Sequence, residues 1–142
     1  MQVGWTALAE PRRLTSAEQA VLDRLVARAG SAGLTAQAAS AWVTAVCDCG
    51  CRSVRLRSDA AALPPASMMD LSSTGRDDWF SIDCTRIGRD PSEVDRSPGN
   101  VPLFQVVVHV VGGLLHELEI FAGEGVAVEV PRPEELNEIT LM

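Results

Sequence analysis

Three cysteines within five residues are the side chains of this chain best suited to chemistry. They form the run Cys47-Asp48-Cys49-Gly50-Cys51. Thiolates are soft ligands that suit zinc and copper(I), and glycine permits the tight turn that would gather alternate sulfur atoms around one ion. On a straight strand the three side chains would be too widely spaced, so metal binding requires a turn from Asp48 to Gly50.

A tetrahedral zinc site needs a fourth ligand, and Cys84 is the candidate because it lies on a predicted strand. The spacing of the four cysteines is not a standard zinc-finger or zinc-ribbon signature. The alternative interpretation is that they are small buried side chains at a hairpin, as free cysteines usually are. A redox dithiol is disfavoured because no C-x-x-C precedes a helix.

The two histidines of the chain form a second constellation. If Gly112-Gly113 is a two-residue hairpin turn, His109 pairs with His116 on one face of the sheet, and Glu117 and Glu119 lie on the other. Such a pair could hold a metal ion, share a proton near neutral pH or serve an enzyme. We favour simple packing near the end of the hairpin, because histidine is so often merely accommodated.

Acidic residues dominate the C-terminal half. The net charge of -7 opposes binding to nucleic acid, which needs a clustered basic face. No calcium-loop or H-E-x-x-H pattern organises the glutamates, so a solvated surface that could attract a basic protein partner is expected. These glutamates are Glu117, Glu119, Glu124, Glu129, Glu134, Glu135 and Glu138.

Two helices and a sheet must position these groups. Thr15 and Glu18 form a capping box that predicts a helix over Ser16 to Ala29, and an alanine-rich second helix follows over Leu34 to Ala41. Alternation of apolar and polar residues predicts five strands, over residues 42–47, 54–57, 79–84, 103–111 and 114–121. Residues 126–130 could add one more strand.

The chain of 142 residues is long enough for one domain. We predict a single α+β domain over residues 1–142, with a single antiparallel sheet of about five strands and the N-terminal helices packed on one face. Residues 1–13 and 132–142 are expected to be peripheral. Neither a secretory signal nor a membrane-spanning stretch is recognisable, so a cytoplasmic protein with reduced thiols and no membrane partner is expected.

The order of these motifs resembles that of a group of small bacterial proteins for which no activity is established. The resemblance implies the fold outline and transfers no functional residue. It rests on Leu14-Thr15 at the start of a helix, on the C-x-C-G-C run followed by Ser53, Val54 and Leu56, and on Gly113, Leu115, Leu118, Glu119, Ile120 and Phe121.

Common catalytic motifs are missing, including the G-x-S-x-G elbow, the phosphate-binding P-loop and the dinucleotide-binding glycine pattern. We therefore expect a protein that is not an enzyme and that acts as an interaction module, similar to an immunity protein or an inhibitor. The alternative is a zinc-binding protein that uses Cys47, Cys49 and Cys51, with Cys84 as the fourth ligand.

Overall fold

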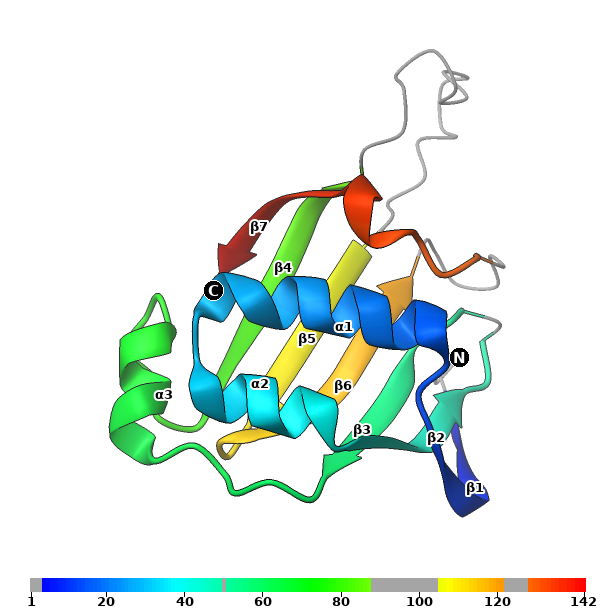
Figure 1. Ribbon diagram of the computed structural model, residues 1–142, viewed down its shortest axis with the longest axis horizontal. Coiled ribbons are helices and arrows are strands. Elements are labelled where there is room, and N and C mark those ends of the chain that lie inside the picture. The colour runs from blue at the N-terminus through cyan, green and yellow to red at the C-terminus, as the bar shows by residue number, and fades with distance from the viewer. Residues whose placement is uncertain (1–3, 50, 88–104, 122–127) are drawn as a thin grey trace.

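One antiparallel sheet, three α-helices and a short 3-10 helix, η2 (Pro133–Glu135), are the regular elements of the part of the chain that the computed structural model describes, residues 4–49, 51–87, 105–121 and 128–142. The strand order is β1-β2-β3-β6-β5-β4-β7 (Figure 1). The strands are β1 (Trp5–Arg13), β2 (Ala41–Cys47), β3 (Val54–Ser58), β4 (Trp79–Ile87), β5 (Gln105–Val111), β6 (Leu114–Phe121) and β7 (Leu136–Leu141). The helices are α1 (Ser16–Ala29), α2 (Ala32–Ala39) and α3 (Pro65–Leu71).

The α+β class with a single sheet is confirmed, but the sheet has seven strands where five were predicted. The two additional strands are β1 and β7, which form its two edges from segments that were expected to be peripheral. Val128 to Val130, where a further strand was predicted, are not in a strand. Residues 103, 104, 126 and 127 of the predicted strands lie outside the described ranges.

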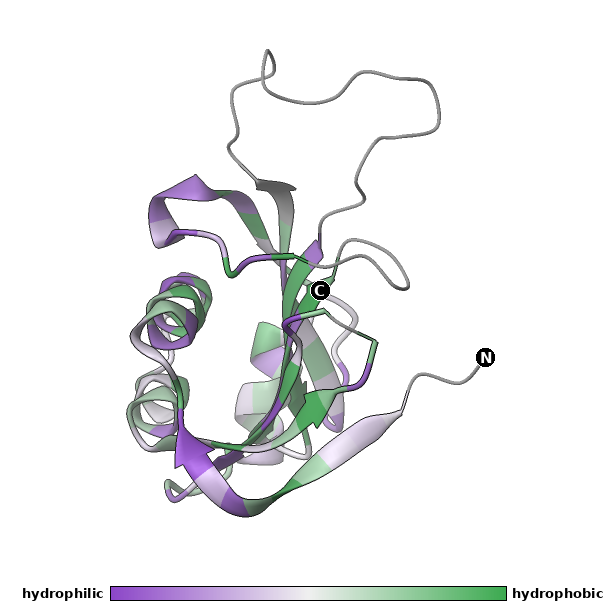
Figure 2. Ribbon diagram, turned by 90° about the vertical axis from the view of Figure 1, so that its right-hand side faces the viewer, coloured by the Kyte–Doolittle hydropathy of each residue, from purple (hydrophilic) through white to green (hydrophobic). Residues whose placement is uncertain are grey.

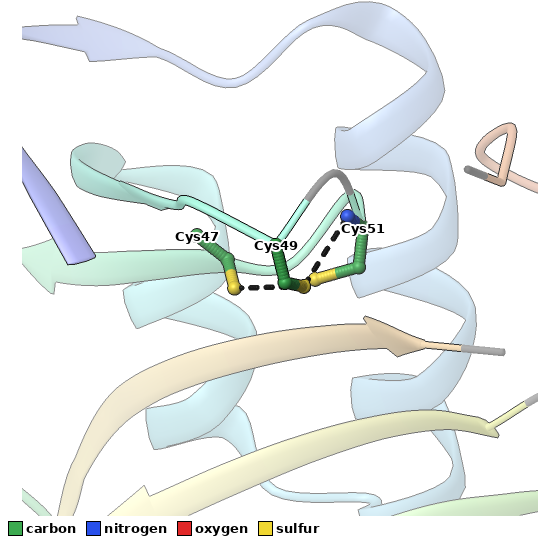
Figure 3. Close-up of side chains that lie close together, drawn as sticks. All are labelled: Cys47, Cys49 and Cys51. Carbon is green, nitrogen blue, oxygen red and sulfur yellow. Dashed lines mark hydrogen bonds between the residues drawn. The ribbon is translucent and has the colours of Figure 1, made fainter. Parts of the chain in front are cut away.

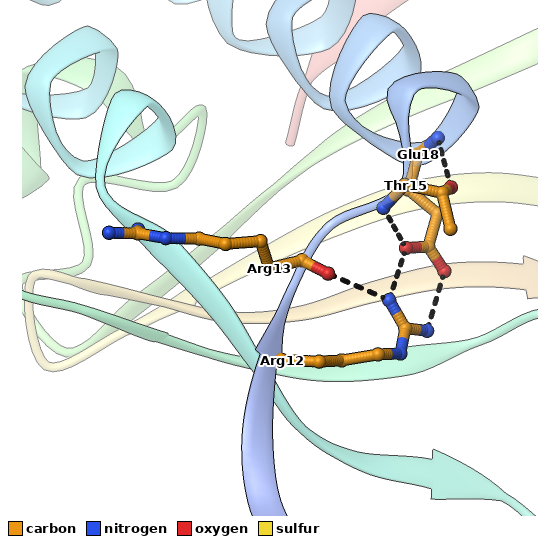
Figure 4. A network of polar contacts seen from close by, with 4 residues as sticks. All are labelled: Arg12, Arg13, Thr15 and Glu18. Carbon is orange, nitrogen blue, oxygen red and sulfur yellow. Dashed lines mark hydrogen bonds and ion pairs between the residues drawn. The ribbon is translucent and has the colours of Figure 1, made fainter.

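Helix α1 begins at the capping box that the sequence predicted. The hydroxyl of Thr15 accepts the amide N–H of Glu18, and the Glu18 carboxylate accepts the Thr15 N–H at 2.8 Å. Arg12 of β1 donates two hydrogen bonds, of 2.9 and 3.2 Å, to the same carboxylate (Figure 4). The helix ends at Gly30, whose φ of 63° is a left-handed conformation that glycine adopts without strain. One carboxylate thus joins the helix start to the edge strand.

Helices α1 and α2 lie side by side across one face of the sheet, and the described residues place no helix on the opposite face (Figures 1 and 2). We call these the helix-covered face and the open face. Side chains from the strands and both helices form the apolar core between the two layers. Its fully buried members include Leu22, Leu25, Leu34, Phe80, Ile82, Leu115, Leu118 and Ile120. Burying one such side chain contributes about 1.5–3 kcal/mol.

Gln37 of α2 is a polar residue within this core, with no exposed surface. Its amide donates to the carbonyl oxygens of Ala61 and Gly113, at 3.1 and 2.8 Å, and its oxygen accepts the N–H of Leu115 at 2.8 Å. Gly113 has a φ of 83°, and a Cβ there would overlap the backbone of Leu63. Gln37 therefore fastens α2 to a β5–β6 turn that requires glycine.

Within the described ranges, no helix has both the length and the apolar character that crossing a membrane requires.

Candidate metal centre

A bulge in β2 determines which face of the sheet Cys47 occupies. The pairing of β2 with β3 shifts between Val43 and Ala45, so Thr44 has no partner opposite it. Side chains alternate along a strand, so one extra residue moves those that follow to the other face. Val43 accordingly packs in the core beneath the helices, whereas Cys47 lies on the open face.

The chain turns at Asp48 and Cys49, as metal binding required; Gly50 lies outside the described ranges. The turn brings the three sulfur atoms of Cys47, Cys49 and Cys51 within 4.8 Å of one another, and none of them is in a disulfide (Figure 3). Cys47 is 9% exposed and Cys51 is 8% exposed, whereas Cys49 is more open to solvent. We call these three residues the thiol cluster.

Two strands hold the turn from opposite sides. On the β1 side, the N–H of Asp48 donates to the carbonyl of Gly4 at 3.0 Å, and the Thr6 hydroxyl bonds to the Asp48 carboxylate. On the β6 side, the hydroxyl of Ser53 accepts the N–H of Ile120 at 2.9 Å. The edge strand that the sequence did not predict is therefore part of the support for the thiol cluster.

Hydrogen bonds inside the cluster make its three sulfur atoms unequal. The thiol of Cys47 donates to the sulfur of Cys49 at 3.1 Å, and the N–H of Cys51 donates to the same sulfur at 3.4 Å. Burial raises the pKa of Cys47 to about 12. Burial opposes ionisation of Cys49 too, but hydrogen bonds from the Cys51 and Cys47 side chains and from the backbone bring its pKa below the ordinary value. Of Cys47 and Cys49, Cys49 is therefore the residue at which a thiolate forms more readily.

Cys84 does not join the thiol cluster, contrary to the expectation of a fourth cysteine ligand. It lies on β4, separated from β2 by three strands, and it packs in the core beneath the helices. Its thiol donates to the carbonyl of Asn137 on β7 at 3.0 Å. Cys84 is thus on the other face of the sheet, because its register partner Val106 points into the core.

A second bulge separates the two histidines. Val110 pairs with Leu115 as predicted, but His109 pairs with Glu117 and leaves His116 without a partner strand residue. The prediction that His109 lies opposite His116 is therefore wrong, and His116 is exposed. Since the extra residue reverses the alternation, Glu117 shares the open face with His109 instead of lying behind it.

His109 lies close to two glutamates, Glu117 and Glu119. Its Nε2 lies 3.2 Å from Oε1 of Glu119, and one donor atom each from His109, Glu117 and Glu119 fall within 4.8 Å of one another. The hydrogen bond with Glu119 raises the pKa of His109. Burial raises the pKa of Glu117, and the neighbouring charge of Glu119 adds to this shift. We call these three residues the histidine–glutamate cluster.

The thiol cluster and the two glutamates of the histidine–glutamate cluster border one hollow of about 210 Å³ on the open face. The thiol cluster forms one part of its wall, and the carboxylate-bearing residues Glu117 and Glu119 form another. Two aromatic side chains add apolar surface. The full lining is Trp5, Cys47, Cys49, Cys51, Ser53, Gln105, Glu117, Glu119 and Phe121. The three cysteines and the two glutamates therefore face a common space.

One signal in the sequence could have revealed this arrangement. Leu115 and Leu118 are three residues apart, and in a regular strand they would point to opposite faces. Both are fully buried in the same core, which is compatible only with an extra residue between them. That extra residue is His116.

The predicted acidic surface is seen in part. Glu129, Glu134 and Glu138 are exposed, Glu135 is half-buried, and Glu124 lies outside the described ranges. Arg132 forms ion pairs with Glu134 and Glu135, at 3.7 and 3.1 Å. The basic partner that this surface was expected to attract stays a prediction.

Fold and site together define an α+β protein with a single antiparallel sheet and a cysteine-bearing turn on its open face. No protein-family model, curated protein or solved structure matches the chain. The assignment of a function therefore depends on the chemistry of the site.

Proposed function

We propose that this protein binds a thiophilic metal ion, with zinc as the favoured ion, through Cys47, Cys49 and Cys51. The observation that carries the proposal is the clustering of three free sulfur atoms within 4.8 Å on a turn whose ends are fastened to two strands. Sulfur atoms around a tetrahedral zinc ion lie roughly 3.8 Å apart, given Zn–S bonds of about 2.3 Å. The turn would need only a small adjustment to reach that spacing.

The chemistry of the donors supports the same conclusion. Metal binding requires thiolates, and the lowered pKa of Cys49 favours a first thiolate at neutral pH. A cation close to that thiolate would then favour loss of the protons of Cys47 and Cys51, as metal ions do for thiols that coordinate them. Glu117 and Glu119 line the same hollow and increase its attraction for cations.

Three thiolates leave one of the four positions that zinc usually fills. Cys84 cannot supply the missing donor, since it lies on the helix-covered face. A carboxylate of the hollow or a solvent molecule is the remaining choice. Because all three sulfur donors belong to one turn between β2 and β3, the bound ion would stabilise that turn and the neighbouring strands.

Native mass spectrometry of protein prepared without chelator or affinity metal tests the proposal. The wild type should retain one zinc at Cys47, Cys49 and Cys51 under reducing conditions, and acid should release it. Cys49→Ser should lose this ion, because serine does not supply a thiolate. Cys84→Ala is the matched control, since it removes a cysteine outside the cluster and should keep the ion.

Counting the reactive thiols tests zinc binding in a second way that does not use mass spectrometry. In the zinc-loaded protein, the three cluster thiols should be protected from a thiol reagent, and a chelator should restore their reactivity. Equal reactivity with and without zinc, together with Cys49→Ser binding zinc as tightly as the wild type, would contradict the proposal.

The interaction module is the second candidate, favoured by the exposure of Glu129, Glu134 and Glu138 in the C-terminal segment of the chain. A basic protein that binds there should dissociate as salt rises, because exposed charges are screened at high ionic strength. Replacing Glu129 and Glu134 by glutamine should weaken the complex, and Cys49→Ser should leave it intact.

A further inference from the structure

We infer that His109, Glu117 and Glu119 form a second cation site, which takes a divalent ion that accepts nitrogen and oxygen ligands, zinc in particular. This site uses other residues than the thiol cluster, and the inference does not depend on the function proposed above. The second bulge creates it by bringing Glu117 and Glu119 to the face of His109. An imidazole and two carboxylates are a frequent protein ligand set for zinc.

The geometry already gathers the donors without an ion. One donor atom of each residue lies within 4.8 Å of the others, and His109 and Glu119 are 3.2 Å apart. The side chains of His109 and Glu119 are 25% and 27% exposed, so they are partly shielded and still accessible from solvent. Glu117 and Glu119 border the hollow, which provides a path for the ion.

The charges around the cluster favour a cation. Asp83 on β4 lies on the same face, and the carboxylates of Glu117, Glu119 and Asp83 all act on His109. Arg55 is the guanidinium that faces Glu117 across the β3–β6 pairing, and it lies 4.5 Å over the ring of Trp5. Three carboxylates thus act on one imidazole, and one guanidinium faces Glu117; a divalent ion would offset the remaining negative charge.

Neighbouring side chains also hold the imidazole in place. The ring of Trp79 stacks on His109 with centroids 6.2 Å apart and an interplanar angle of 23°. The Asp83 carboxylate is itself fixed, because it accepts the hydroxyl of Ser81 at 2.6 Å. A preorganised ligand loses less freedom on binding, which increases affinity.

NMR of the wild-type protein tests the site with all of its ligands intact. The chain has two histidines, so the imidazole nitrogen signals can be assigned with single variants. Addition of Zn²⁺ up to two equivalents, enough to fill both sites, should shift or broaden the His109 signals and leave those of His116 unchanged, because His116 is exposed and outside the cluster. Equal perturbation of both histidines, or no change at His109, would overturn the inference.

Zinc stoichiometry in four variants separates the two sites. The wild type should bind two ions, Cys49→Ser one, and His109→Ala one, whereas His116→Ala should still bind two. The double variant Glu117→Gln and Glu119→Gln keeps the size of both side chains and should also lose one ion. Circular dichroism on each variant confirms that the fold is retained.

The zinc stoichiometries distinguish failure of this inference from failure of the proposed function. If His109→Ala binds as many ions as the wild type, this inference is wrong even when the thiol cluster binds zinc. If Cys49→Ser binds as many ions as the wild type and His109→Ala loses one, the thiol proposal is wrong and the histidine–glutamate site stands.

Discussion

The two faces of the sheet are formed by the same strands but differ in the side chains that they carry. The helix-covered face is apolar and closed, with Phe80, Ile82 and Leu118 fully buried against α1 and α2. The open face gathers cysteines and glutamates around a hollow of about 210 Å³, and His109 lies beside the glutamates. Neighbouring residues of one strand, Leu118 and Glu119, serve the two faces. The apolar side chains that stabilise the fold thus lie on one side of the sheet, and the side chains capable of binding a metal ion lie on the other.

The bulges explain how one sheet supports both. Each inserts a single residue, Thr44 in β2 and His116 in β6, and each reverses the alternation of the residues that follow. Without them, Cys47 would point toward the helices, and Glu117 and Glu119 would point into the core. Bulges often re-aim side chains next to functional sites, and here they bring both ligand sets to one face.

Truncation on β6 gives the largest expected contrast between the faces. Leu118→Ala should destabilise the protein by about 2–5 kcal/mol, because it opens a cavity in a packed core. Glu119→Gln, one residue away, should change the stability of the metal-free protein far less. Urea unfolding of both variants with a chelator present measures the difference. Equal losses would show that the open face is packed like the core.

Gln37→Ala tests the polar contact within the helix-covered layer. The change leaves the N–H of Leu115 and the carbonyl of Gly113 without their side-chain partner. The expected cost is about 1–3 kcal/mol, because the N–H of Leu115 becomes a buried unsatisfied donor, whereas the Gly113 carbonyl still accepts the N–H of Leu63. Hydrogen exchange of the Leu115 amide should accelerate together with the loss of stability. An amide that stays as protected as in the wild type would contradict this role.

Removal of metal should lower the stability of the protein only when the metal sites on the open face are intact. At a free zinc concentration about 100 times the Kd, binding stabilises the folded state by about 2.7 kcal/mol. A chelator should therefore lower the Tm of the wild type and of Cys84→Ala. It should leave the Tm of a variant lacking both sites, Cys49→Ser with His109→Ala, unchanged. A chelator effect that persists in this double variant would place the ion elsewhere.

Glu18→Gln gives the smallest expected effect and a defined pH dependence. Burial opposes ionisation, but hydrogen bonds from Arg12 and Thr15 lower the pKa of Glu18 below its ordinary value. The carboxylate therefore stabilises the fold above the pKa of the unfolded chain, and this contribution is lost as the pH falls through the lower folded pKa.

Glutamine keeps the capping hydrogen bond and removes the charge, so Glu18→Gln should cost about 1 kcal/mol at pH 7. The difference from wild type should shrink toward zero as the pH is lowered below about 4. Glu10→Gln, an exposed residue of the same edge strand, is the control and should show no such trend. A difference that is independent of pH would exclude the charge as its cause.

Local signals made part of the fold predictable. The capping box of Thr15 and Glu18 identified α1 with its observed bounds, and Gly112-Gly113 identified the turn between β5 and β6. These signals work because a helix end or a two-residue turn depends on a few neighbouring residues. The second helix was predicted about two residues too late, at Leu34 to Ala41.

Strand register and the sheet edges were not predictable in the same way. β1 contains Pro11 and mostly exposed residues, and β7 alternates weakly, so neither shows the pattern of a half-buried strand. Their position at the edges follows from pairing with distant strands. The thiol turn was anticipated from the run of cysteines, but Cys84, which was expected to supply the fourth ligand, packs in the core on the helix-covered face, as the register of β4 requires.

X-ray absorption at the zinc edge tests the central claim most directly. With one equivalent of zinc added to His109→Ala, which leaves only the thiol cluster, the account predicts three sulfur atoms at about 2.3 Å and one lighter atom. The same sample of Cys49→Ser with His109→Ala should show no such shell. A shell of only nitrogen and oxygen atoms in the His109→Ala protein would contradict the claim that Cys47, Cys49 and Cys51 bind the ion.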